Sequence, residues 1–172
     1  MLVDFMMTQK LLCCEINLPT KPLTSFDDPE GEIALCTLSA INWGKIQDPR
    51  DFEKPCTLAV RGLDALLDYQ NYPVKAAENS TKRRRPLGIG IINLAYWMAK
   101  NEMTYSEPNL DLIDRYAEAW SYYLIKASAD LAKEDGKPEG SDETKYGQGL
   151  LPIDTYKKDV DELVKRELTY DW

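Results

Sequence analysis

The stretch Gly31-Glu32-Ile33-Ala34-Leu35-Cys36-Thr37-Leu38-Ser39-Ala40 decides the expected fold, because it is an apolar run of strand length that stops at a turn. Residues 11–18 form an earlier run of the same kind, which ends at Pro19. The residues between the runs are rich in Pro, Asp and Gly, which is typical of a loop. We therefore predict strands over residues 11–18 and 32–41.

Helical patterns follow these strands. Asp48 before Pro49 predicts a helix N-terminus, and Pro55 is expected to delay the regular helix until after itself. From there to Tyr69, one apolar face is predicted from Ala59, Leu63, Leu66 and Leu67.

The remainder of the chain alternates between strand and helix patterns. We predict a polar loop over residues 71–85, a buried strand over 86–92 and a helix over 93–100. Residues 111–132 give the clearest helix, and residues 135–149 a loop with one helical turn after Ser141. A last helix is predicted over residues 156–165. Strands that alternate with helices indicate an α/β fold with parallel pairing.

Composition excludes several classes of function. The chain has 172 residues, 44% of them hydrophobic, and a net charge of -8, which argues against general affinity for nucleic acid or anionic membranes. No apolar run reaches the roughly 18 residues of a membrane span, and the first seven residues do not resemble a signal peptide. Four cysteines without an export signal predict reduced thiols in the cytoplasm. The absence of histidine excludes Ser-His and Cys-His pairs within this chain.

Two cysteine segments are the candidate chemical site. In an extended segment Cys13 and Glu15 share one face, where a thiol and a carboxylate could act on one small substrate, and Cys14 points the other way. Apolar surroundings would raise the pKa of the carboxyl group and suit it to general-base catalysis. The alternative makes the two cysteines buried apolar residues and Glu15 a surface charge, and spacing alone favours that alternative.

The order of the segments carries more information than their spacing. The string Leu12-Cys13-Cys14-Glu15-Ile16-Asn17-Leu18-Pro19-Thr20-Lys21-Pro22, followed by residues 31–40, resembles the catalytic barrel of the class I ribonucleotide reductase large subunit. Similarity continues through residues 59–70, 84–90 and 151–159. The resemblance implies part of a ten-stranded α/β barrel of two parallel half-barrels, with a finger loop that bears a radical cysteine. Residues 9–172 would belong to this barrel, and residues 1–8 would be an extension from outside the family.

The same resemblance implies a role for three residues. Cys13 matches the cysteine that becomes a thiyl radical and takes hydrogen from the ribose C3′. Glu15 matches the carboxylate that removes the 3′-hydroxyl proton, and Cys36 matches one of two cysteines that end as a disulfide. The family has an asparagine two residues before the radical cysteine, where this chain has Leu11. The redox partner of Cys36 would lie upstream of Met1.

Partners and cofactors are likewise implied by the family. The substrate would be a ribonucleoside diphosphate, reduced for deoxyribonucleotide biosynthesis and DNA replication. A separate metal-containing small subunit would generate the radical, and thioredoxin or glutaredoxin would be the reductant. No cofactor or metal is expected on this chain itself, which would work only with the remaining parts of the large subunit. The alternative is a non-catalytic remnant that pairs with an intact reductase.

Three further motifs are interpreted as structural. Gly88-Ile89-Gly90 lacks the remainder of a dinucleotide-binding pattern, and the cysteine spacings do not fit a zinc site. The basic run Lys82-Arg83-Arg84-Arg85 could contact phosphate, but a solvated loop is favoured in so acidic a chain. Tyr116, Trp120 and Tyr123 could stack on bases, but their helical spacing favours a core face.

Overall fold

The computed structural model describes residues 28–151 and 168–172. In these ranges two strands, β1 (Thr37–Asn42) and β2 (Leu87–Ile92), pair in parallel with Thr37 opposite Leu87. Helices α2 and α3 lie between the strands in the chain, so the unit is a β-α-β crossover. The α/β class predicted from the sequence is therefore confirmed. The predicted elements over residues 11–18 and 156–165 lie outside the described residues.

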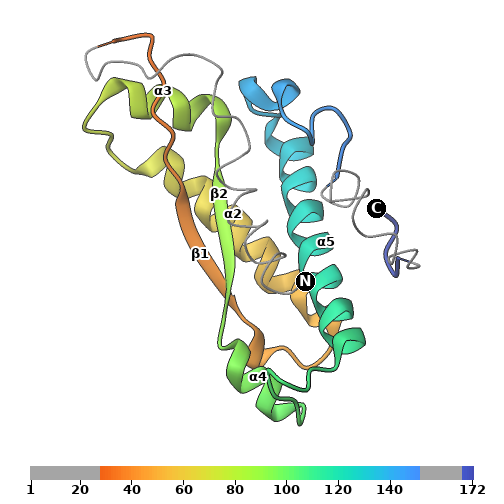
Figure 1. Ribbon diagram of the computed structural model, residues 1–172. Coiled ribbons are helices and arrows are strands. Elements are labelled where there is room, and N and C mark those ends of the chain that lie inside the picture. The colour runs from red at the N-terminus through yellow and green to blue at the C-terminus, as the bar shows by residue number, and fades with distance from the viewer. Residues whose placement is uncertain (1–27, 152–167) are drawn as a thin grey trace.

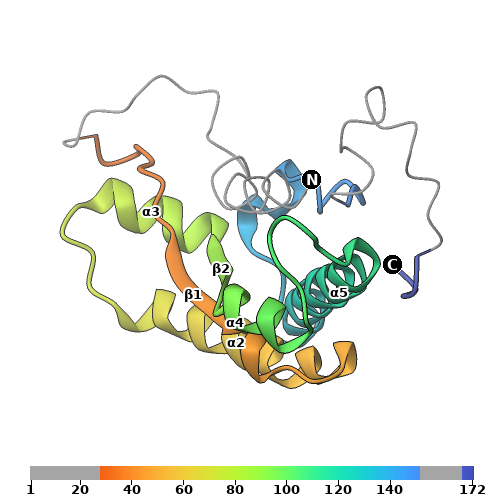
Figure 2. The same cartoon turned by 60° about the horizontal axis from the view of Figure 1, so that its bottom comes forward.

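Helices surround this sheet on one face and at both ends. In chain order they are α2 (Glu53–Tyr69), α3 (Lys75–Arg84), α4 (Leu94–Lys100) and α5 (Leu110–Asp135), with 3-10 turns η1 (Trp43–Lys45), η2 (Pro49–Phe52) and η3 (Glu139–Glu143). Helix α2 packs on the sheet and against α5 (Figures 1 and 2). Helix α3 lies at the end where the strands begin, and α4 at the end where they finish (Figure 1).

The start of the helical region follows the sequence prediction in part. The Asp48 carboxylate accepts a hydrogen bond from the Arg50 backbone N–H at 3.0 Å, and the Asp51 carboxylate accepts one from the Asp48 N–H at 2.9 Å. This capping box begins η2 at Pro49, as predicted. The expected delay at Pro55 is wrong, because α2 already begins at Glu53. Proline is tolerated there because N–H groups in a first helical turn have no acceptor within the helix.

Helix α2 buries Cys56, Val60, Leu63 and Leu67, which recur at helical spacing. Ala59 is half-buried against the core, but Leu66 is 47% exposed. The prediction that placed Leu66 on the buried face is therefore wrong. The face that packs on the sheet and α5 is rotated toward Cys56 and Val60.

A cluster of large aromatic side chains forms the core beside the carboxyl ends of the strands. Trp43, Trp97 and Trp120 are fully buried, and the Trp43 ring lies 5.2 Å from Trp97 and 5.5 Å from Phe52 between ring centroids. Tyr116 of α5 joins the cluster 4.8 Å from Trp97. The prediction of a core face on α5 is confirmed, because Tyr116 and Trp120 are buried, and Tyr123 packs against the same cluster.

The predicted loop over residues 71–85 is wrong, because α3 occupies most of it. The buried face of α3 consists of Ala76, Ala77, Ser80 and Thr81, which are small residues without an apolar pattern. Basic residues fill its last turn, where they interact favourably with the negative end of the helix dipole. Arg85 then ends the helix in the left-handed conformation, with φ of 45°.

Strand β1 begins later than predicted, at Thr37. The two faces of the sheet that it forms with β2 differ in their exposure to solvent. Ile41 is buried beneath the helices, whereas Leu38 is 74% exposed and Ile92 is 51% exposed on the other face. Ala40 and Gly90, which are paired across the strands, are also exposed on that face. Within the described residues, helices therefore cover only one side of the sheet.

We expect Gly44→Ala to lower the free energy of unfolding by about 1–3 kcal/mol through overpacking. A Cβ at Gly44 would overlap the Asn93 side-chain amide and lie 2.7 Å from Tyr96 Cδ1. The Asn93 amide cannot move freely, because it donates a hydrogen bond to Asn42 Oδ1 at 3.1 Å. Urea denaturation gives the measurement. The control is Gly62→Ala, where a Cβ would meet nothing within 4 Å and better helix propensity should stabilise by about 0.5–1 kcal/mol. Equal effects at both glycines would contradict the steric argument.

Candidate functional site

Cys36 is the one predicted site residue that the structure describes. It is half-buried and lies immediately before β1, whereas Cys13 and Glu15 lie outside the described residues. Its sulfur is engaged in a disulfide, so the reduced thiol expected from the composition is not found at Cys36. The structure therefore places one of the three predicted residues and leaves their mutual geometry a prediction.

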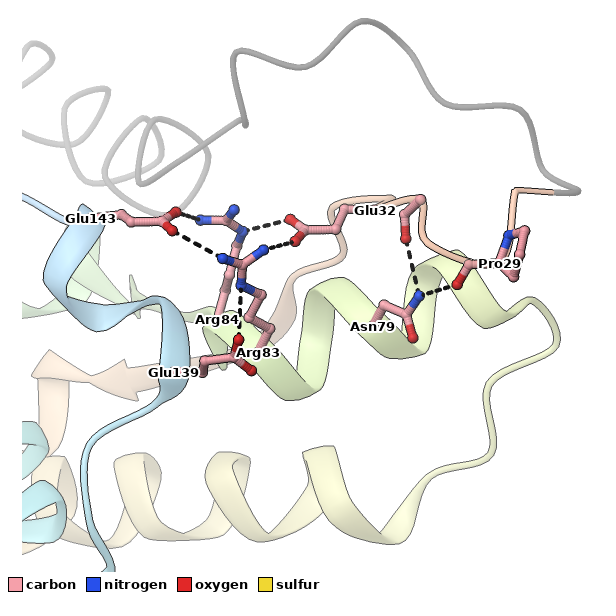
Figure 3. Close-up of polar contacts among 8 residues, drawn as sticks. Pro29, Glu32, Asn79, Arg83, Arg84, Glu139 and Glu143 are labelled. Atoms are coloured by element: carbon pink, nitrogen blue, oxygen red, sulfur yellow. Dashed lines mark hydrogen bonds and ion pairs between the residues drawn. The ribbon is translucent and has the colours of Figure 1, made fainter.

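The segment that leads to Cys36 lies along α3. Asn79 Nδ2 donates hydrogen bonds to the carbonyl oxygens of Pro29 at 2.7 Å and Gly31 at 3.2 Å (Figure 3). The Ile33 backbone N–H donates to the Ala76 carbonyl at 3.0 Å. Main-chain groups on residues 29–33 are thus fixed to a helix before the chain reaches Cys36.

Glu32 adds ion pairs to these hydrogen bonds. Its Oε1 accepts from Arg83 Nη1 at 2.8 Å, and its Oε2 accepts from Arg84 Nε at 2.7 Å. The side chains of Glu32 and Arg84 are only 10% and 9% exposed. Burial by itself raises the pKa of Glu32, but the hydrogen bonds from Arg84 and Arg83 outweigh it and hold that pKa below its ordinary value.

Turn η3 supplies a second carboxylate, that of Glu143, to the two arginines. The Glu143 carboxylate accepts from Arg83 Nη2 at 3.0 Å and from Arg84 Nη1 at 3.1 Å, so two carboxylates and two guanidiniums form a ring (Figure 3). Glu139 lies 3.8 Å from Arg83 Nε. We call Glu32, Arg83, Arg84, Glu139 and Glu143 the arginine clamp. It joins three segments that are far apart in the sequence.

The other two residues of the basic run are also paired. Arg85 binds Asp64 through Nε at 2.6 Å and Asp68 through Nη2 at 2.8 Å, and Lys82 binds Asp68 at 2.9 Å. Hydrogen bonds from Arg85 and Lys82 hold the pKa of Asp68 well below its ordinary range. The predicted solvated loop is thus a helix end in which every cation has a carboxylate partner. These ion pairs leave no unpaired charge of this run for a phosphate.

Sequence reasoning missed a buried carboxylate on α5. Glu118 is 6% exposed, and its Oε1 accepts from the backbone N–H groups of Thr169 at 2.7 Å and Tyr170 at 3.2 Å. Trp172 Nε1 donates to the same oxygen at 3.4 Å, and the Tyr170 ring stacks on Tyr122 with centroids 4.6 Å apart. Glu118 therefore holds residues 169–172 against α5.

Cys56 is a buried core residue of α2. Burial raises the pKa of its thiol from about 9 to about 12. Nucleophilic cysteines need the opposite shift, toward the thiolate. Cys56 is therefore an unreactive thiol and serves as an internal reference for the other cysteines.

This pKa shift predicts alkaline destabilisation. The folded state keeps Cys56 protonated while the unfolded chain ionises it, so its contribution is complete below pH 9 and is lost between pH 9 and 12. The free energy of unfolding should fall with pH by up to about 1.4 kcal/mol per unit from this group. Between pH 9 and 10, urea midpoints of Cys56→Ala should fall less steeply than those of the unchanged chain. Parallel slopes would contradict the assignment.

The described part of the chain contains neither a candidate membrane span nor a candidate metal site. Among the described helices, none combines the length and the apolar character that a membrane crossing requires. Residues 28–151 and 168–172 contain no group of three or more His, Cys, Asp or Glu side chains placed to hold a metal ion.

Comparison with known proteins identifies the family. The family described as "Ribonucleotide reductase, barrel domain" matches residues 7–172. The chain belongs to the ribonucleotide reductase family. It is 58% identical over 165 residues to the ribonucleoside-diphosphate reductase subunit alpha of Haemophilus influenzae, and 53% identical over 165 residues to the ribonucleoside-diphosphate reductase 1 subunit alpha of Escherichia coli K12. These alignments cover 95% of this chain and 22% of each relative. The corresponding subunit of Enterobacteria phage T4 is 44% identical over 169 residues, which are 95% of this chain and 21% of that relative. The chain thus spans about a fifth of the length of these relatives.

Proposed function

We propose that this chain supplies the radical-bearing part of the catalytic barrel in a ribonucleoside-diphosphate reductase large subunit. The observation that carries the proposal is the continuous family match over residues 7–172, which includes Cys13, Glu15 and Cys36. The relatives are named as subunits alpha of that reductase. We propose residues 9–172 as the barrel part, residues 1–8 as an extension and the cytoplasm as its location.

The sheet geometry supports the proposed barrel. Parallel sheets in α/β proteins have both faces covered, whereas helices in the described part of the chain cover one face of β1 and β2. Leu38 and Ile92 are exposed on the other face. In the proposal β1 and β2 are neighbouring strands of a ten-stranded barrel, this exposed face points into the barrel, and a finger loop brings Cys13 to it.

The proposed chemistry uses three side chains of this chain. The Cys13 thiyl radical takes the hydrogen atom from the ribose C3′, which leaves a thiol and a carbon radical. The Glu15 carboxylate accepts the 3′-hydroxyl proton as the 2′-hydroxyl is protonated and departs as water. Cys36 and a second thiol of the large subunit provide two electrons and two protons and become a disulfide. The Glu15 carboxyl group then returns its proton to the 3′-oxygen, and Cys13 returns its hydrogen atom to C3′ and is again a radical.

The proposal requires partners that supply a radical and a reductant. A separate metal-containing small subunit would oxidise Cys13, and thioredoxin or glutaredoxin would reduce the Cys36 disulfide after each turnover. Such a radical must be held against the sugar and away from water, which a loop enclosed by a barrel can provide. The substrate class is a ribonucleoside diphosphate, in keeping with the name of the relatives.

A chimaeric subunit tests this proposal. Residues 7–172 replace the aligned segment of the Haemophilus influenzae subunit alpha, and the protein is assayed with its small subunit and reductant for deoxyribonucleoside diphosphate. We expect product, and we expect Leu11→Asn to increase it, because leucine cannot hydrogen-bond the substrate hydroxyls. A folded chimaera that forms no product with either residue would overturn the proposal and favour the non-catalytic remnant.

A further inference from the structure

We propose that the arginine clamp, through Arg84 and Glu32, positions Cys36 by fixing the main chain that leads into it. Arg84 and Glu32 are positioning residues, because neither belongs to the predicted chemical site and both would act on Cys36 only through the main chain that leads to it. The central pair of the clamp is shielded from solvent, because the Arg84 and Glu32 side chains are 9% and 10% exposed, whereas those of the Arg61–Glu134 ion pair are 42% and 52% exposed. Its importance for reduction rests on the proposed function, whereas its effect on the Cys36 segment does not.

Cys36 lies between two fixed stretches of main chain. On one side, α3 holds residues 29–33 through Asn79, the Ala76 carbonyl and the two clamp arginines. On the other side, Thr37 begins the ladder with β2. Residues 34–36 span the interval, and the Cα of Cys36 is roughly 13 Å along the chain from that of Glu32 if extended. A shift of Cys36 therefore requires one of these attachments to break.

The clamp is rigid because each of its two guanidiniums has a carboxylate partner on two sides. Each guanidinium contacts Glu32 on one side and Glu143 on the other, so neither arginine can swing to solvent without losing two ion pairs. Planar guanidiniums bind two acceptors in a fixed geometry, which an ammonium cannot reproduce. Gly140 also packs closely here, since a Cβ there would lie 3.2 Å from Arg84 Cγ.

Thiol labelling of the 172-residue chain tests the clamp directly. The protein is reduced and treated with iodoacetamide, and the labelling rates of Cys36 and Cys56 are measured by peptide mass spectrometry. We expect Arg84→Ala to label Cys36 about five- to tenfold faster, because freed segments open locally more often, with Cys56 unchanged. Arg84→Ala and Glu32→Gln remove charges of opposite sign, so faster Cys36 labelling in both variants reports exposure of the thiol and not a change in local charge.

Three variants make the test specific. Arg61→Ala removes an exposed Arg61–Glu134 ion pair on another part of the surface and should change neither rate. In Arg84→Lys, Cys36 should be labelled more slowly than in Arg84→Ala but faster than in the unchanged chain. Glu32→Gln keeps the shape of the side chain but not its charge, and should also accelerate Cys36 alone. The proposal is overturned if Glu32→Gln leaves the Cys36 rate unchanged, or if every clamp variant accelerates Cys36 and Cys56 equally.

The chimaeric subunit separates the clamp from the proposed function. There, Arg84→Ala should lower kcat about tenfold or more with little change in KM, because a displaced Cys36 delivers electrons poorly to a substrate that still binds. If labelling responds as expected but kcat is unchanged, the clamp stands and the redox role of Cys36 fails. If labelling does not respond, the clamp fails whatever the activity of the chimaera.

Discussion

Turnover of the chimaeric subunit should fall by at least about 1000-fold when Cys13 is replaced by serine, because removing an obligatory reacting group leaves only background chemistry. A serine O–H bond is stronger than a thiol S–H bond, so an incoming radical would not settle on the hydroxyl group. The substitution is otherwise nearly isosteric, so substrate binding should persist. The measurement is the rate of deoxyribonucleoside diphosphate formation under saturating substrate and reductant.

The matched control for this experiment is Cys14→Ser. Cys14 is adjacent in sequence and would point to the opposite face of an extended segment, so its loss should change turnover by no more than about threefold. Both variants remove one sulfur from the same segment, which makes general damage to the loop equal. Turnover that survives Cys13→Ser, or that falls equally in both variants, would refute the role assigned to Cys13.

The elements that sequence predicted well are those with strong local signals. The 26-residue helix α5 carries its apolar stripe over many turns, and its Tyr116 and Trp120 are in the core as expected. Strand β2 follows an uninterrupted apolar run, and the Asp48-Pro49 start is a short-range capping signal. Each of these patterns is complete within a few residues, so no distant partner is needed to interpret it.

Helix α3 could not be predicted from local pattern because its stability depends on distant residues. Its buried face is made of small side chains that give no apolar period, and its basic end looks solvated when the chain is considered alone. The carboxylates that pair with that end lie on other elements: Glu32 before β1, Asp64 and Asp68 on α2, and Glu143 in η3. Tertiary ion pairing thus overrides a local pattern that is typical of a loop.

Dependence on distant residues also explains why the sequence predicted the cysteine site but not the arginine clamp. The cysteine order identified the family, but Glu32 is a single charge inside an apolar run and shows no partner in the sequence. The available signal was the concentration of four cations at residues 82–85 in a chain of net charge -8. Such a cluster in an acidic protein needs carboxylate partners, yet sequence alone does not say which of the 29 acidic residues provide them.

The largest loss of stability is expected for Trp97→Ala, at about 3–5 kcal/mol. Trp97 is fully buried, and its ring contacts Trp43 edge-on at 5.2 Å and lies 4.8 Å from Tyr116 between ring centroids. Truncation removes both aromatic contacts and leaves a cavity in the cluster that connects β1, α4 and α5. Because a domain of this size is stable by only about 5–15 kcal/mol, much of that margin would be lost.

Urea denaturation followed by circular dichroism measures this effect, and Tyr69→Ala provides the matched aromatic control. Tyr69 is 86% exposed at the end of α2, so its truncation should change the free energy of unfolding by no more than about 0.5 kcal/mol. A Trp97→Ala loss as small as that of Tyr69→Ala would show that the aromatic cluster does not hold the sheet to α5.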